Sequence, residues 1–192
     1  KRLGARVEAF DTRAVVAEQV QSLGAKFVEI DLGETGQTKD GYANALTPEQ
    51  LELQRLGMKD VISQADIVIT TAQLFGRPAP RIITADMVAA MKPGGVIVDM
   101  AVDSGGNVEG SKPDETVEID GVSIIGVSNL PAQVSSDASQ MYSSNLYNLV
   151  REYWDEESKT FKLDLEDDIL KGCVITHEGG LVNEAIKNIR GS

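Results

Sequence analysis

The sequence predicts an α/β protein built on a doubly wound parallel sheet. Short apolar runs alternate with segments of helical periodicity, and glycine and proline lie between them. This alternation is typical of parallel sheets, whose strands are connected by helices that cover both faces. The chain has 192 residues, of which 42% are hydrophobic, so it is long enough to bury a sizeable core.

The first elements follow one another closely. "RVEAF" (6–10) and "KFVEI" (26–30) are predicted strands, and residues 14–23 form the helix between them, which Gly24 ends. The apolar residues of that helix share one stripe: Val15, Val16, Val20 and Leu23. Since a helix end and a turn precede the first of these strands, we expect the first strand of the sheet and its glycine-rich loop to lie before Lys1. The predicted sheet lacks both.

A long polar loop separates these elements from the next helix. Residues 31–46 hold three glycines and show no apolar period, a combination typical of functional lids. The helix that follows has a clear start, because Thr47 and Gln50 form a capping box and Pro48 fits the first helical position. "ADIVITTA" (65–72) is then predicted as a buried central strand.

The second half of the sheet is predicted from three further segments. Thr84 is expected to cap a short helix, "GVIVDMA" (95–101) to form a buried strand, and "TVEIDGVSIIG" to form a hairpin that turns at Asp120-Gly121. Residues 137–151 are predicted as a long amphipathic helix. Four of its apolar residues are expected to face inward: Met141, Leu146, Leu149 and Val150. The alternation stops after Trp154, and "DEESKT" is predicted as a charged linker with a domain boundary near residue 155.

Composition excludes several classes of function. A net charge of -12 argues against a nucleic-acid surface or an anionic membrane surface, since both need clustered lysine and arginine. No apolar run approaches the roughly 20 residues that cross a bilayer. The one cysteine, Cys173, excludes an internal disulfide and favours a reducing compartment, and its apolar neighbours predict that it is buried.

Ligands of a doubly wound sheet bind beyond the carboxyl ends of its strands. Asp11 follows the first predicted strand, where an acid can accept hydrogen bonds from the ribose of a dinucleotide and repel a 2′-phosphate, although it could also cap the next helix. Arg13 leaves the choice between NAD and NADP open, because an arginine there can accept that phosphate. Asp103 is a candidate acid or base, Asp99 is expected to support a loop, and the single histidine, His177, is expected on the surface.

Several stretches resemble one family. "RVEAFDTR", "DGYA", "ADIVITTAQLFGRPAPRIITADMVAAMKPGGVIVDMAVDSGGN" and "SNLPAQVSSDASQMYSSNLYNLV" are similar to the NAD(H)-binding component (alpha subunit, domain I) of proton-translocating NAD(P) transhydrogenase, within the alanine dehydrogenase/transhydrogenase superfamily. The resemblance extends to the tail "GCVITHEGGLVNEAI". It implies direct hydride transfer from NADH on this component to NADP on a separate component, coupled to proton movement through a membrane part.

The resemblance also implies a domain plan. Residues 1–136 would be a partial Rossmann-like NAD(H)-binding domain, residues 137–155 a long inter-domain helix and linker, and residues 156–192 a segment that returns to an N-terminal domain outside this sequence. The component would work as a homodimer. It would dock as a peripheral protein on the cytoplasmic side of the inner or plasma membrane, or on the matrix side in mitochondria.

Site residues follow from the same resemblance. We expect a cofactor-binding set, with no catalytic side chain and no metal ligand, because hydride would pass between two nicotinamides. That set is Asp11, Thr12 and Arg13 at the adenosine ribose, Gly41 and Tyr42 in a mobile loop, Gln54 on the following helix, and Ala72 and Gln73 beside the cofactor. Since the family usually has leucine at the position of Gln73, only a backbone contact is expected there.

Two alternatives stay open. Alanine dehydrogenase, a related NAD-dependent oxidoreductase, shares the "MKPGGVIVDMAVDSGGN" type of segment and has an aspartate at the position of Asp103. The second alternative is a non-catalytic fragment, because a sheet without its glycine loop also lacks the helix N-terminus that binds pyrophosphate.

Overall fold

The computed structural model describes residues 1–13, 15–33, 46–74 and 76–190. Its largest sheet has four strands in the order β3-β4-β6-β5. The first three of these are parallel and β5 is antiparallel at the edge. The strands are β3 (Ile67–Thr70), β4 (Val96–Asp99), β5 (Glu115–Ile119) and β6 (Val122–Gly126). The predicted α/β class with a mainly parallel sheet is confirmed.

A second, two-stranded parallel sheet holds the N-terminal elements. It pairs β1 (Glu8–Ala9) with β2 (Lys26–Phe27), and α1 (Val16–Ser22) connects them. The doubly wound fold has the spatial strand order 3-2-1-4-5-6, in which the strands are numbered along the chain. Here β1 and β2 correspond to strands 2 and 3 of that fold, and β3, β4 and β6 correspond to strands 4, 5 and 6. None of the described strands corresponds to strand 1. β3 is therefore an edge strand, and Ile67 and Ile69, which share one of its faces, are 65% and 61% exposed, so the prediction of a buried central strand at residues 65–72 is wrong.

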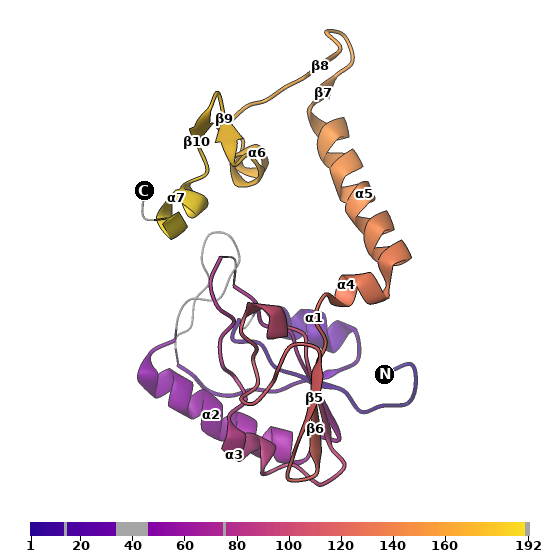
Figure 1. Ribbon diagram of the computed structural model, residues 1–192, viewed down its shortest axis with the longest axis vertical. Coiled ribbons are helices and arrows are strands. Elements are labelled where there is room, and N and C mark those ends of the chain that lie inside the picture. Colours follow the sequence, from indigo (N-terminus) through magenta and orange to yellow (C-terminus); the bar gives the residue numbers. More distant parts are fainter. Residues whose placement is uncertain (14, 34–45, 75, 191–192) are drawn as a thin grey trace.

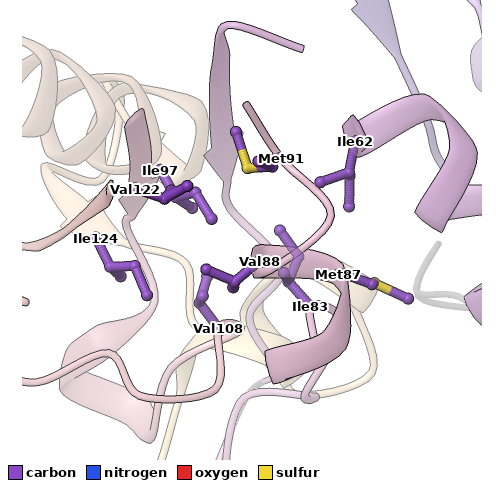
Figure 2. Close-up of a cluster of buried hydrophobic side chains, with 9 residues drawn as sticks. All are labelled: Ile62, Ile83, Met87, Val88, Met91, Ile97, Val108, Val122 and Ile124. Carbon is purple, nitrogen blue, oxygen red and sulfur yellow. The ribbon is translucent and has the colours of Figure 1, made fainter. Parts of the chain in front are cut away.

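The main core lies between the four-stranded sheet and two helices, α2 (Pro48–Ser63) and α3 (Ala85–Val88), which lie side by side (Figure 1). Figure 2 shows the cluster, whose members point toward one another from both helices, from β4 and β6 and from the adjoining loops. The nine buried residues are Ile62, Ile83, Met87, Val88, Met91, Ile97, Val108, Val122 and Ile124. This apolar layer fixes the strands whose carboxyl ends carry the predicted site residues.

Local signals set several boundaries as predicted. Thr47 Oγ1 accepts from the Gln50 N–H at 3.3 Å, and Gln50 Oε1 accepts from the Thr47 N–H at 3.0 Å, so the capping box is present. Asp120 and Gly121 both have positive φ, 51° and 77°, as a tight hairpin turn requires. Thr84 occupies the N-cap of α3, but the Ala85 N–H donates to Glu109 Oε2 at 2.8 Å instead. The predicted side-chain cap by Thr84 is therefore wrong.

Two predicted apolar faces are not buried. At the two ends of α1, Val15 is 61% and Leu23 81% exposed, while Val16 and Val20 within the helix are half-buried. In α5 (Ser135–Tyr153), Met141, Leu146 and Val150 are 70%, 46% and 50% exposed, so the prediction that they face inward is wrong. Figure 1 shows the reason: α5 follows α4 (Leu130–Gln133) away from the sheet, and no described element packs along its apolar side.

The tail forms small elements of its own. A hairpin of β7 (Trp154–Asp155) and β8 (Thr160–Phe161) stands where a charged linker was predicted. The remaining elements are α6 (Asp168–Cys173), β9 (Thr176–His177), β10 (Gly180–Leu181) and α7 (Glu184–Arg190). Cys173 is exposed at the end of α6, so the prediction of a buried cysteine is wrong. Within the described ranges, no helix has the length and apolarity needed to cross a membrane.

Candidate functional site

Asp11 lies just beyond the carboxyl end of β1 and is bound by Arg13. Its Oδ1 accepts from the Arg13 backbone N–H at 2.8 Å and from Arg13 Nε at 2.9 Å, and its Oδ2 accepts from a terminal guanidinium nitrogen at 2.9 Å. Partial burial raises the pKa of Asp11, but the hydrogen bonds and positive charge of Arg13 outweigh it and lower the pKa below 3.8. Asp11 is therefore an oriented carboxylate at neutral pH.

A cleft of about 180 Å³ opens beside Asp11. Its walls come from the ends of β1 and β2, which lie side by side because these strands are parallel neighbours. The lining residues are Phe10, Asp11, Thr12, Phe27, Val28, Glu29, Ile30, Asp31, Leu32 and Gly33. Asp11 and Thr12 therefore share a concave site whose lining combines apolar and acidic side chains.

The carboxyl end of β3 is tied to the loop after β4 by Asn107, which is fully buried. Asn107 Oδ1 accepts from the Ala72 N–H at 3.0 Å, and Asn107 Nδ2 donates to Ala72 O at 2.9 Å and to Pro80 O at 2.8 Å. Both backbone groups of Ala72 are therefore hydrogen-bonded to this one side chain. Gln73 Nε2 donates to Met100 O at 3.2 Å.

Asp99, at the end of β4, is fully buried and supports the same loop, as the sequence predicted. Its Oδ1 accepts from the Ala101 N–H at 3.0 Å and from Thr70 Oγ1 at 3.3 Å, and its Oδ2 accepts from the Val108 N–H at 3.2 Å. Gly106 has φ 78°, and a Cβ there would lie 2.7 Å from Asp99 Oδ2. The glycine is needed for this close approach.

Asp103 connects the ends of β4 and β6. It lies in a short 3-10 helix, Val102–Ser104, and its Oδ2 accepts from the Asn129 N–H at 2.9 Å. The Asn129 backbone bond, followed by one from the Ser128 hydroxyl, lowers the pKa of Asp103. Asp103 is thus ionised at neutral pH and holds the loop after β6.

The other predicted residues are placed as follows. Gln54 is buried in the second turn of α2, and Gly57 of that helix packs tightly on the Ile30 side chain that lines the cleft. Gly41 and Tyr42 lie outside the described residues. The structure groups Asp11 and Thr12 in one cleft with Arg13 bonded to Asp11, whereas Ala72 and Gln73 lie at the end of another strand. Within the described ranges, no group of three or more acidic, histidine or cysteine side chains could hold a metal ion.

Sequence reasoning missed Asn107 as a site-building residue. The only signal for it is its place directly after two glycines at a strand end, and that pattern does not reveal that its amide pairs with Ala72, 35 positions earlier.

A mainly parallel sheet with tightly braced loops after β3, β4 and β6, together with an oriented acid after β1 of the two-stranded sheet, defines a nucleotide-binding α/β domain. Residues 1–184 match the model of the family described as alanine dehydrogenase/PNT, C-terminal domain, and the chain belongs to that family.

Among individual relatives, the chain is 42% identical over 188 residues to an NAD(P) transhydrogenase subunit alpha chain of Rhodospirillum rubrum, covering 97% of this chain and 49% of that protein. It is 32% identical over 133 residues to alanine dehydrogenase of Halomonas elongata, covering 67% of this chain and 35% of that protein. A crystal structure of transhydrogenase from Sinorhizobium meliloti superimposes with a TM-score of 0.69 at 39% identity, covering 94% of this chain and 46% of that one. The chain spans about half the length of the transhydrogenase relatives that it matches.

Proposed function

We propose that this chain belongs to the NAD(H)-binding component of a proton-translocating NAD(P) transhydrogenase. In this role it holds NADH while hydride passes directly to NADP on a separate component. The observation that carries the proposal is the Asp11 carboxylate, oriented by Arg13 in a cleft between the ends of β1 and β2. A carboxylate in this position accepts hydrogen bonds from the adenosine ribose hydroxyls.

The pairing of Asp11 with Arg13 supports NAD(H) over NADP(H) at this site. The two side chains form a fork-like ion pair, so the charge of Arg13 is matched by Asp11. A ligand carrying a 2′-phosphate would place its negative charge beside the Asp11 carboxylate, and that repulsion disfavours NADP(H).

The residues of the site bind and orient the cofactor in this proposal. Thr12 adds a cleft wall, and Ala72 and Gln73 present the end of β3. Gln54 of α2 is a nucleotide contact, and Gly41 and Tyr42 belong to the loop that closes over the nucleotide. NAD(H) itself supplies the hydride chemistry. The protein brings the nicotinamide to its acceptor and excludes water.

The wider assembly is proposed on the same grounds. The transhydrogenase relatives are named as alpha subunits, so further subunits supply the NADP-binding and membrane components. The component would be peripheral, on the cytoplasmic side of the membrane or on the matrix side in mitochondria, and would work as a homodimer. Residues 137–155 would link the nucleotide-binding domain, residues 1–136, to the domain that residues 156–192 join.

The test is a titration of the full natural chain that carries this sequence with NADH, in which binding is monitored by the change in NADH fluorescence. Asp11→Ala should weaken binding by about 1–3 kcal/mol, since ribose hydroxyls lose their acceptor. Asp60→Ala, which removes an exposed carboxylate of α2, serves as the control. If wild type and Asp11→Ala bind NADH with equal affinity, Asp11 does not accept hydrogen bonds from the ribose.

A second assay separates the two enzyme families. Reduction of an NADP analogue by NADH, dependent on added NADP-binding component, is expected. Formation of NADH from NAD and L-alanine by this chain alone would instead favour an alanine dehydrogenase. Asp103, which that alternative would use in catalysis, is exposed and accepts from the Asn129 N–H through Oδ2, so the assay and not this residue decides between the two families.

A further inference from the structure

The loop between β3 and α3 is organised around one side chain. Asn107 is completely buried and makes three side-chain hydrogen bonds of 2.8 to 3.0 Å. Two of them pair with the N–H and the C=O of Ala72, in the way that a neighbouring strand would. The third reaches Pro80, at the far end of the loop. The amide thereby extends the hydrogen bonding of β3 by one residue.

The backbone of Asn107 fixes the far end as well. Its carbonyl oxygen accepts from the Ile82 N–H at 2.8 Å and from the Ile83 N–H at 2.9 Å. Asn107 therefore bonds to both ends of the loop, through its side chain at Ala72 and Pro80 and through its carbonyl oxygen at Ile82 and Ile83. Asp99 in turn fixes the chain next to Asn107 by accepting from the Val108 N–H.

From this geometry we propose that Asn107 is the positioning residue of the nucleotide site. Its side chain sets the place of Ala72 and Gln73, and NAD(H) affinity depends on it although its buried amide does not touch the nucleotide. The inference rests on the proposed function, because Ala72 and Gln73 are the cofactor contacts at the end of β3.

The chain contains a matched control for this residue. Asn183 is 7% exposed, and its Nδ2 donates to Lys171 O at 3.3 Å and to Gly172 O at 3.2 Å, while its Oδ1 accepts from the Ile186 N–H at 3.1 Å. It has the same hydrogen-bonding pattern as Asn107, two carbonyls and one N–H, but braces the tail.

The experiment compares Asn107→Asp with Asn183→Asp in the full natural chain. Each change keeps the side-chain volume and the bond to the N–H but removes both donors. For Asn107→Asp, the loss of two hydrogen bonds at Ala72 and Pro80 should raise the Kd for NADH by about tenfold or more. For Asn183→Asp the Kd should stay within about twofold of wild type, although both variants lose thermal stability. Equal Kd changes in the two variants would overturn the proposal.

Hydrogen exchange gives a readout that needs neither a folded variant nor a bound nucleotide. In the wild-type chain without NADH, the Ala72 amide should exchange slowly because Asn107 Oδ1 accepts its proton. Exchange of the Ala72 amide at the rate of an exposed loop would refute the positioning role, even if NADH binds. Slow exchange of the Ala72 amide in a chain that does not bind NADH would instead count against the proposed function, and it would still support the hydrogen bond from Ala72 to Asn107.

Discussion

Gly126, the last residue of β6, is a position where a single added methyl group should clash with backbone. A Cβ at this position would lie 2.3 Å from the carbonyl oxygen of Lys112 and 3.1 Å from Val102 Cγ2. Ordinary contact begins near 3.4 Å, so Gly126→Ala requires a movement of about 1 Å. Because the closest atom belongs to the backbone, no change of rotamer at Lys112 relieves the clash.

The cost can be worked from these contacts. Overpacking of this kind costs about 1–3 kcal/mol. The movement also disturbs the bond from the Asp114 N–H to Gly126 O, 2.6 Å long, at the point where β6 ends beside the start of the antiparallel β5. A neutral hydrogen bond contributes about 1 kcal/mol. We expect Gly126→Ala to lower the free energy of unfolding by about 2 kcal/mol.

Gly172→Ala is the matched control. Gly172 lies inside α6, and a Cβ there would meet nothing within 4 Å, so alanine should stabilise the chain by about 0.5–1 kcal/mol. The assay is urea unfolding followed by far-UV circular dichroism, with stabilities compared at equal slope. The packing argument fails if Gly126→Ala unfolds at the wild-type midpoint, or if both glycine variants lose stability alike.

Three further outcomes are expected. Thr47→Ala should cost about 1 kcal/mol in urea unfolding, because it removes the capping box of α2, whereas Thr84→Ala should cost less, and the reverse order would contradict the observed caps. Tyr153 donates to Asp167 Oδ1 at 2.6 Å, and this bond raises the pKa of Tyr153 to about 12. The contribution of the bond to the free energy of unfolding should therefore be lost as the pH rises from about 10 to about 12, and in Tyr153→Phe the free energy of unfolding should change less over that window. Arg13→Ala leaves the burial that raises the pKa of Asp11 but removes the side-chain bonds that lower it, so NADH binding, titrated from pH 7 downward, should weaken at a higher pH than in wild type; identical pH profiles would refute this role.

Signals confined to a few neighbouring residues predicted structure well. The capping box at Thr47 and the turn at Asp120-Gly121 depend on hydrogen bonds and φ values within four residues of each other, and both are present. The strand runs "ADIVITTA" and "GVIVDMA" also correspond to β3 and β4. β4 is buried or half-buried throughout, as a parallel strand that is apolar on both faces should be, whereas β3 lies at the edge of the sheet with Ile67 and Ile69 exposed.

An apolar pattern predicts that one face of a helix can be buried, but it does not identify the element that covers that face. The stripe on α5 was predicted to face inward, yet Met141 and Val150 are exposed, because the four-stranded sheet is already covered by α2 and α3 on the face that holds the core. Asn107 could not be predicted either, since its partner Ala72 is 35 positions away and no local rule connects a polar residue after two glycines with a distant strand end.

The carboxylates near the strand ends bear on the choice between the two families. A general base needs an acceptor site aimed at its substrate and a pKa near the working pH. Asp99 is buried among the Thr70 hydroxyl and two backbone N–H groups, and Asp103 is bonded to the Asn129 N–H, which lowers its pKa. Both side chains brace loops. Direct hydride transfer between two nicotinamides, as proposed, needs an oriented cofactor and no general base from this chain. If the chain instead oxidised alanine, the exposed Asp103 would be the candidate base.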